Sequence, residues 1–319
     1  MIINILLLIF GFVILIKGAD FFVDGASATA AYLKVSKILI GLTIVAFGTS
    51  APELAISLNA LANGSTDMLL GNVIGSNIMN ILLILGIAAV IHPINIKNNT
   101  VKKELPLTML ISTLLAVLFL DIKLGNGITN SITRSDAIVI LLFFTIFLYY
   151  LISLARKKRE EDEEENDEKP MHIVKAIFLV IVGLAGIIIG SDLVVECAKD
   201  IATSLKISER VISLTIIAFG TSLPELTTTI IASRKGEQDL IVGNIIGSNI
   251  FNICIVLGIP VAIYGTITPS SFQITDIITL VASSIALFLF SETSKKITKL
   301  EGVLLLMSFA IYYTLVFII

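Results

Sequence analysis

The chain has 319 residues, of which 56% are hydrophobic and only 15% are charged, and its mean hydropathy is +0.99. An average soluble domain is nearer a quarter charged, so this composition excludes an ordinary soluble protein. The formal net charge of −3 shows no basic excess, and no nucleic-acid partner is expected. Apolar stretches long enough to cross roughly 30 Å of hydrocarbon recur along the chain, which predicts an all-α, polytopic membrane protein.

The first half of the chain contains five predicted membrane spans. The first, near residues 2–30, is long and therefore expected to tilt. It lacks a positive n-region and a small-residue cleavage site, so we interpret it as a span rather than a signal peptide. The other four lie near residues 38–62, 68–91, 104–121 and 135–155. Residues 156–172 are too charged to fold alone and predict an aqueous linker.

The second half repeats the first at an offset of 172 residues. LTIVAFGTSAPEL (42–54) matches LTIIAFGTSLPEL (214–226), and GNVIGSNIMNILLILG (71–86) matches GNIIGSNIFNICIVLG (243–258). The five spans of this half are predicted near residues 173–202, 210–233, 240–263, 273–290 and 300–318. We therefore predict two repeats, 1–155 and 173–319, each with five spans. An odd number of spans per repeat makes the repeats inverted, with ten transmembrane helices in all.

The distribution of Lys and Arg predicts the orientation in the membrane. If the N-terminus is outside, 17 of the 22 Lys and Arg residues fall in cytoplasmic segments and 5 fall outside. Because positive charge gathers on the cytoplasmic side, we expect both termini outside and the acidic linker in the cytoplasm. The expected location is the cell membrane.

Each LTI(V/I)AFGTS(A/L)PEL segment places a proline inside a predicted span. Pro52 has no N–H, so the carbonyl of Gly48 loses its helical partner, and Pro224 has the same effect on Gly220. Helices broken near the midplane of inverted repeats are typical of secondary transporters. The freed backbone oxygens must face protein or water rather than lipid.

Oxygen-bearing side chains surround each break. They are Thr49, Ser50 and Glu53 in the first repeat, and Thr221, Ser222 and Glu225 in the second. An ionisable group within a span indicates a functional site, and the second, third and eighth spans contain no Lys or Arg to neutralise it. Carbonyls, hydroxyls and two carboxylates form an oxygen ligand set for a hard cation such as Ca2+.

The second repeated motif, GN(V/I)IGSNI(M/F)N, is expected to line the opposite wall of this site. Helical spacing puts Ser76 and Asn80 on one face of their span, and Ser248 and Asn252 on one face of theirs. The neighbouring amides, Asn77 and Asn249, either join these ligands or hold the backbone. For the glycine pairs, close helix contact is the favoured interpretation: Gly71 with Gly75, and Gly243 with Gly247.

The two repeated motifs resemble the α-repeats of the Na+/Ca2+ exchanger branch of the cation/Ca2+ exchanger superfamily, of the prokaryotic calcium/sodium antiporter type. The resemblance covers both halves of the chain. It implies a ten-helix, inverted-repeat antiporter that exchanges Ca2+ for Na+, with Glu53 and Glu225 bridging the Ca2+ and Na+ sites. It also implies oxygen ligands from the backbone of Ala46, Thr49, Ala218 and Thr221, the hydroxyls of Ser50, Ser76, Ser222 and Ser248, and the amide of Asn80.

Asn252 departs from the pattern, because similar prokaryotic exchangers can carry Asp at this position. An amide keeps an oxygen ligand and removes a titratable group, so we expect exchange to persist with weaker proton dependence. The resemblance implies transported Ca2+ and Na+ and a lipid bilayer as partners, no cofactor and no obligate protein partner.

Other interpretations stay open at this point. A Ca2+/H+ antiporter could use the same scaffold if Glu53 or Glu225 were protonated as Ca2+ leaves. An intramembrane protease could use two buried acids, but the G-x-G-D signature and H-E-x-x-H are absent from the sequence. The chain is therefore not expected to be an enzyme. Cys197 and Cys254 are expected to be buried and unpaired.

Overall fold

The computed structural model describes residues 2–124, 129–161, 171–205, 218–269 and 274–318. The chain forms two compact units, one of residues 1–52 and 155–244 and the other of residues 53–154 and 245–319. It passes between them within α4 (Ala51–Ala62), α10 (Arg134–Glu161) and α15 (Gln238–Phe251). Each unit thus contains segments of both sequence repeats, and the repeat boundaries stay a prediction.

The first unit is helical. Its N-terminal part contains α1 (Ile2–Leu33), α2 (Lys37–Ile40), η1 (Gly41–Val45), α3 (Ala46–Thr49) and the start of α4, where η denotes a π-helical segment. The rest contains the end of α10, α11 (Ile173–Ser204), α13 (Ala218–Thr221), α14 (Leu223–Arg234) and the first half of α15. The N-terminal part of the seventh predicted span, 210–217, lies outside the described residues.

The second unit contains the remaining helices of the described chain. From the first half of the chain come most of α4, α5 (Thr66–Ile78), η2 (Met79–Ile84), α6 (Leu85–Ile91), α7 (Asn98–Lys102), α8 (Glu104–Phe119), α9 (Asp121–Leu124) and most of α10. From the second half come the end of α15, η4 (Asn252–Leu257), α16 (Gly258–Tyr264), α17 (Ile274–Ser294) and α18 (Lys299–Ile318). Two short strands, β1 (Ile94–Asn95) and β2 (Lys296–Ile297), pair antiparallel.

Within the described part of the chain, seven helices are long and apolar enough to cross a membrane. The segments Lys37–Thr49 and Ala51–Ala62, which meet at a bend of 44°, make an eighth candidate if they form one span. The fourth predicted span corresponds to α8, a helix of 16 residues. These helices confirm a multi-pass membrane protein, while the total of ten spans stays a prediction.

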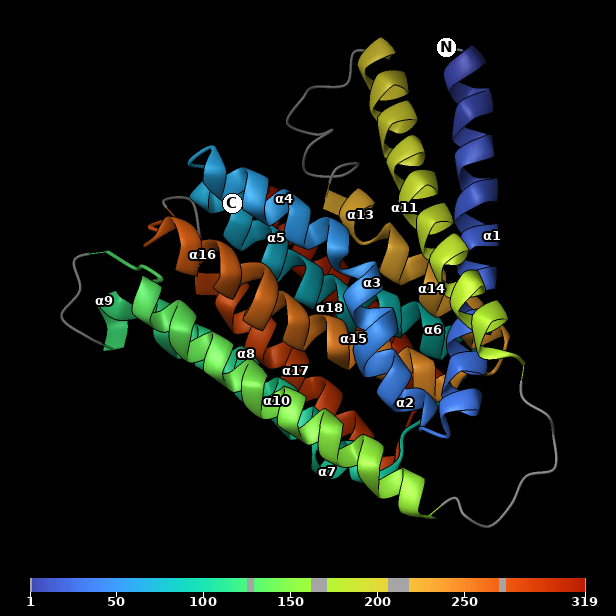
Figure 1. Ribbon diagram of the computed structural model, residues 1–319. Coiled ribbons are helices and arrows are strands. Elements are labelled where there is room, and N and C mark those ends of the chain that lie inside the picture. The colour runs from blue at the N-terminus through green and yellow to red at the C-terminus, as the bar shows by residue number, and fades with distance from the viewer. Residues whose placement is uncertain (1, 125–128, 162–170, 206–217, 270–273, 319) are drawn as a thin grey trace. The chain divides into compact units, whose positions relative to one another are not determined.

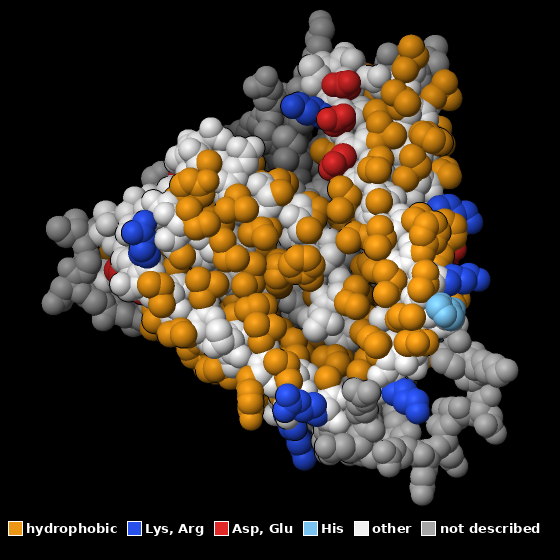
Figure 2. All heavy atoms as spheres, in the orientation of Figure 1, with side chains coloured by type: hydrophobic (Ala, Val, Ile, Leu, Met, Phe, Trp, Pro, Cys, Tyr) orange, Lys and Arg blue, Asp and Glu red, His pale blue; other side chains and the backbone are white. Residues whose placement is uncertain are grey.

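The outer helices expose apolar side chains in a way that a soluble protein would not tolerate. In the apolar windows of α1 and α11, only 28% and 22% of the residues are buried, whereas the window in Gln238–Tyr264 is completely buried. On the face shown in Figure 2, hydrophobic side chains cover much of the surface, and charged side chains gather in a few small groups. Helices with apolar exposed faces are suited to contact with lipid.

Helices α1 and α11 run antiparallel and pack closely through glycines (Figure 1). A Cβ added at Gly183 would lie 2.4 Å from the backbone nitrogen of Phe22, and one added at Gly190 would lie 2.5 Å from that of Leu15. A Cβ added at Gly18 would lie 2.7 Å from the backbone of Gly186. Small residues let two membrane helices approach to backbone contact, so these glycines determine how α1 and α11 fit together.

The glycines of the GN(V/I)IGSN motif differ between the two repeats. A Cβ added at Gly243 would lie 2.6 Å from the carbonyl oxygen of Ile38, which confirms the prediction of close contact there. At Gly71 and Gly75 an added Cβ would meet nothing within 4 Å in the described part of the chain, so close contact is not found there for this pair. Of the three motif glycines whose surroundings the structure describes, Gly243 is the one with a neighbouring backbone against it.

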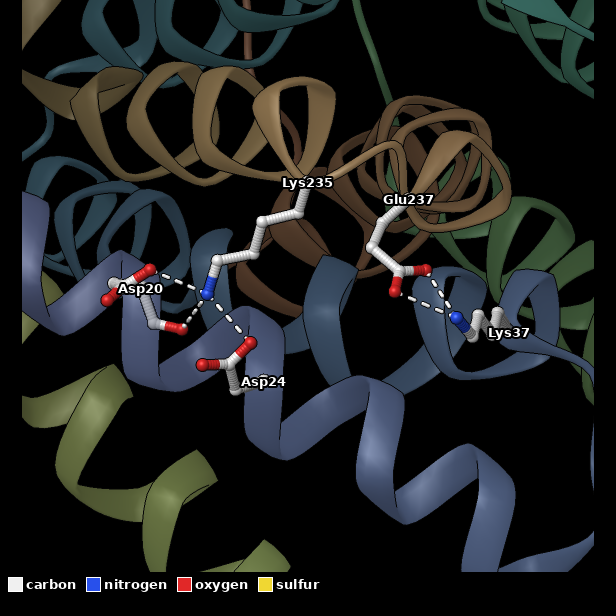
Figure 3. A network of polar contacts seen from close by, with 5 residues as sticks. All are labelled: Asp20, Asp24, Lys37, Lys235 and Glu237. Atoms are coloured by element: carbon white, nitrogen blue, oxygen red, sulfur yellow. Dashed lines mark hydrogen bonds and ion pairs between the residues drawn. The ribbon is translucent and has the colours of Figure 1, made fainter. Parts of the chain in front are cut away.

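Two groups of ion pairs hold the first unit together (Figure 3). Lys235, in the turn between α14 and α15, pairs with Asp20 at 2.6 Å and with Asp24 at 2.7 Å, both on α1. Lys37 pairs with Glu237 at 2.7 Å. Burial opposes the charge of Lys235, but the hydrogen bonds to Asp20 and Asp24 outweigh it and raise the pKa of this lysine.

We expect Lys235→Gln to lower the stability of the purified protein by about 0.5–1 kcal/mol, because the paired side chains remain partly exposed. Since the pKa of Lys235 is raised, this contribution is complete at neutral pH and is lost only as the pH rises through the raised pKa. Thermal unfolding in detergent measures the loss. Asp24→Asn should have an effect of similar size, and additive losses in the double variant would contradict the pairing.

Candidate ion-binding site

The predicted helix breaks are confirmed in both repeats. Between α3 and α4 the residue Ser50 has φ −90° and ψ 5°, and between α13 and α14 the residue Ser222 has φ −93° and ψ 5°. Proline is tolerated in the first turn of the following helix, where its missing N–H would have no helical partner. The carbonyl of Gly220, which Pro224 deprives of that partner, accepts a hydrogen bond of 3.2 Å from the Ser191 hydroxyl on α11.

Glu225 is buried in the first unit, in the first turn of α14, and is only 1% exposed. Its Oε1 accepts a hydrogen bond of 3.0 Å from the hydroxyl of Ser50, which comes from the other broken helix. Its Oε2 has no hydrogen-bond partner among the described residues. A buried carboxylate oxygen costs free energy unless something compensates its charge, which favours a cation as the missing partner.

Thr49 and Asn244 form a second polar contact in the first unit. The Thr49 hydroxyl lies 3.0 Å from the carbonyl of Val45, to which it donates, and 3.2 Å from the Oδ1 of Asn244 on α15. The Nδ2 of Asn244 donates to the Thr229 hydroxyl at 3.4 Å. Asn244 therefore links α3 to α14 across α15, and holds the segment that carries Ser50 and the segment that carries Glu225.

The other predicted ligands of the first unit lie at the same two breaks. The carbonyl of Ala46 accepts a hydrogen bond of 3.0 Å from the backbone N–H of Ser50. The Ser222 hydroxyl is buried and has no hydrogen-bond partner among the described residues. Thr221 ends α13 and is half-buried, and Ala218 begins the same helix.

The second unit holds Glu53, which is completely buried in the first turn of α4. Its backbone carbonyl accepts a hydrogen bond of 3.1 Å from the Nδ2 of Asn72 on α5, and Asn72 also donates to the Ser57 hydroxyl at 3.0 Å. This amide fastens the first turn of α4 to α5. The predicted ligands Ser76 on α5 and Ser248 on α15 are buried in the same unit.

Two predicted ligands of the second unit lie at π-helical segments. Asn80 is the second residue of η2 and Asn252 is the first residue of η4. Asn80 donates from Nδ2 to the Oδ1 of Asn249 at 3.0 Å, and its own Oδ1 has no hydrogen-bond partner among the described residues. Both amide atoms of Asn252 are buried and equally lack such a partner there. Single π-helical turns within longer helices frequently occur at functional sites.

These groups suit a hard cation better than a transition metal. Within the described ranges, no group of three or more His, Cys, Asp or Glu side chains is placed to hold a metal ion. The oxygens described above belong to carboxylates, hydroxyls, amides and carbonyls, which are the donors that Ca2+ and Na+ accept.

Asn72 and Asn244 were missed as candidate residues by the sequence analysis. Both are the first asparagine of the repeated GN(V/I)IGSN motif, at equivalent positions 172 residues apart. The signal was present in the repeat itself, since a polar residue kept in both copies of a membrane helix requires a partner.

Comparison with known proteins decides the family. A model of the family described as sodium/calcium exchanger protein matches residues 3–153 and 175–318. The chain belongs to the sodium/calcium exchanger family. The sodium/calcium exchanger MaX1 of Methanosarcina acetivorans is 36% identical over 350 residues, covering 99% of each chain. The putative antiporter CaxA of Alkalimonas amylolytica is 39% identical over 325 residues, again covering 99% of each chain.

The fold is similar to that of a solved member of the family. The structure of the sodium-calcium exchanger NCX_Mj soaked with Na+ and Sr2+ matches with a TM-score of 0.83 and 33% identity, covering 97% of each chain. The resemblance inferred from the two repeated motifs is thereby confirmed. This sodium/calcium exchanger homologue belongs to a family of transporters, not enzymes, whose substrates are Na+ and Ca2+, and the Ca2+/H+ alternative is not favoured.

Proposed function

We propose that this exchanger moves Ca2+ against several Na+ by alternating access, with Glu53 and Glu225 as the carboxylate ligands of the transported ions. The observation that carries the proposal is the pair of GTS(A/L)PE segments, each of which places a buried glutamate just after a helix break. Two carboxylates neutralise one Ca2+ or balance most of the charge of several Na+. The two kinds of ion therefore compete for the same ligands.

The remaining ligands in the proposal are the oxygens named from the resemblance. Three of these oxygens are buried and have no hydrogen-bond partner among the described residues: the Ser222 hydroxyl and the Oδ1 atoms of Asn80 and Asn252. This supports their assignment as ion ligands. Asn252 contributes an uncharged oxygen, so the proposed site has two carboxylates. Exchange through this site requires no cofactor.

Obligatory exchange follows from the cost of burying charge. A site occupied by Ca2+ or by Na+ is electrically compensated and can close, whereas an empty site with two carboxylates is costly to enclose in a low dielectric. The proposal includes ten spans in two inverted repeats, with both termini outside and the acidic linker in the cytoplasm. In the proposal, α1 and α11 slide together as the gate of the site, and their close contact through glycines supports such a joint movement.

Transport by purified protein in proteoliposomes tests the proposal. With Na+ loaded inside and diluted outside, we expect uptake of radioactive Ca2+ that stops when the Na+ gradient is dissipated. Parallel vesicles carry only an acid-inside proton gradient. Uptake driven by the proton gradient alone would replace the proposal with Ca2+/H+ exchange, and uptake under neither gradient would refute Ca2+ as the substrate.

A further inference from the structure

Asn80 and Asn249 form a buried pair of amides in the second unit. Each side chain is 1% exposed, and the Nδ2 of Asn80, on η2, donates to the Oδ1 of Asn249, on α15, at 3.0 Å. This leaves two amide atoms without a hydrogen-bond partner among the described residues, the Oδ1 of Asn80 and the Nδ2 of Asn249. The bond therefore occupies the nitrogen of Asn80 and leaves its oxygen available.

The two ends of an amide side chain have nearly the same shape and opposite polarity. Only the oxygen binds a cation, because the NH2 group is a donor and repels positive charge. A buried asparagine that rotates by half a turn about its last bond would present the wrong end to the ion. A partner that accepts from the nitrogen opposes this rotation, because turning the amide would bring two oxygens together, and the Oδ1 of Asn249 is such a partner.

Asn77, the residue equivalent to Asn249 in the other repeat, forms its side-chain hydrogen bond within its own helix. Its Nδ2 donates at 2.7 Å to the backbone carbonyl of Val73, one turn earlier in α5. Correspondingly, Asn252, which is equivalent to Asn80, has no partner at either amide atom within the described part of the chain. The identical GSN(I)xN motifs thus differ in structure: one amide is held by the opposite helix and the other is not.

We propose that Asn249 is a positioning residue, which orients the amide of Asn80 so that its oxygen faces the transported cation. The inference rests on the proposed function, because it takes Asn80 as an ion ligand. It adds a residue that does not itself bind the ion and whose effect acts through the orientation of another side chain. It also makes the two repeats unequal, with one amide ligand held in place and one able to rotate.

The test is a double-mutant cycle on ion affinity. In the wild-type background, Asn249→Ala should raise the Ca2+ concentration for half-maximal Na+-driven uptake by about five- to tenfold, the effect of losing one buried hydrogen bond, with the maximal rate within about twofold. In an Asn80→Asp background the same change should raise it less than about twofold. A carboxylate has an oxygen at both ends, so its orientation needs no partner.

Thr108→Ala is the control, because it also removes a buried hydrogen bond of the second unit, the 2.9 Å bond that the Thr108 hydroxyl donates to the carbonyl of Glu104 within α8. Its half-maximal Ca2+ concentration should stay within about twofold of wild type. An equal rise in this control, or an equal effect of Asn249→Ala in both backgrounds, would overturn the proposal. Asn249→Ser, whose hydroxyl is too short to reach Asn80, provides a second variant if Asn249→Ala does not fold.

Ion-dependent thermal stabilisation of the purified protein gives a readout without transport. Ligands that bind the folded state raise the melting temperature, so weaker Ca2+ binding appears as a curve shifted to higher Ca2+. If wild-type vesicles show no exchange but the stabilisation follows the predicted cycle, the proposed function fails and the role of Asn249 stands. If exchange occurs and the cycle shows no coupling, only the role of Asn249 fails.

Discussion

Glu53→Gln and Glu225→Gln are each expected to reduce Na+-driven Ca2+ uptake by at least about 100-fold, while the protein still folds. Glutamine keeps the shape of the side chain and removes its charge. Leaving a buried ion without one of its charged partners typically costs roughly 2–5 kcal/mol, and a 100-fold loss corresponds to about 2.7 kcal/mol. Uptake of radioactive Ca2+ into Na+-loaded proteoliposomes measures the effect.

The same substitutions, which reduce transport, should leave the stability of the ion-free protein unchanged or raise it. Burying a carboxylate is costly, and the Oε2 of Glu225 has no hydrogen-bond partner among the described residues. Glu225→Gln should therefore melt at the same temperature as wild type or higher when no ions are added, and should lose the stabilisation that Ca2+ gives. This pattern separates loss of an ion ligand from simple unfolding.

Ser50→Ala is the control for Glu225→Gln and should have a smaller effect. It removes one neutral hydroxyl, which donates to the carboxylate and is itself a proposed ion ligand, so uptake at limiting Ca2+ should fall only about two- to tenfold. Near-normal uptake by Glu225→Gln would show that this carboxylate is not a ligand of the transported ion. An effect of Ser50→Ala as large as that of Glu225→Gln would contradict the prediction, because the loss of one neutral hydroxyl would then be as harmful as the loss of a carboxylate.

The breaks in the helices were predictable from the sequence because their cause is local. Pro52 and Pro224 lack the N–H that a helix needs, and the structure interrupts the helices at Ser50 and Ser222 beside them. The burial of both glutamates was predictable for a related reason, since each follows the break inside an apolar segment. Local chemistry repeated in two halves gives a strong signal.

The π-helical segments and the roles of the asparagines were not predictable in this way. Nothing in the residues Met79–Ile84 or Asn252–Leu257 distinguishes a π-helical segment from an α-helix of the same composition. Asn77 and Asn249 occupy the same motif, and only packing against another helix determines that one bonds to its own backbone and the other to Asn80. Contacts between segments far apart in sequence decide these features.

The contact between α1 and α11 was predictable from the sequence only in part. Gly11, Gly18 and Gly25 are spaced seven residues apart, as are Gly183 and Gly190, so each set falls on one face of its helix. This spacing indicates a close helix contact, but it does not identify the partner. The structure shows that each set lies against the backbone of the other helix.

Gly183→Ala is expected to lower the melting temperature of the protein on the order of 5–10 °C. The added Cβ would lie 2.4 Å from the backbone nitrogen of Phe22, and because backbone cannot move aside as a side chain can, α1 and α11 must separate. Overpacking of this kind costs about 1–3 kcal/mol or more, and each kcal/mol shifts the melting temperature of a domain of about 150–250 residues by roughly 2–4 °C.

Unfolding can be followed with a thiol-reactive dye, because Cys197 and Cys254 are buried and unpaired and react only when exposed. Gly71→Ala is the matched control: it makes the same change within a helix, but its Cβ would meet no atom of the described residues within 4 Å. Alanine is a better helix former than glycine, so this control should melt at the wild-type temperature or slightly above it. If Gly183→Ala behaved like Gly71→Ala, the two helices would not be in backbone contact in the folded protein, and a sliding pair of α1 and α11 would lose its structural basis.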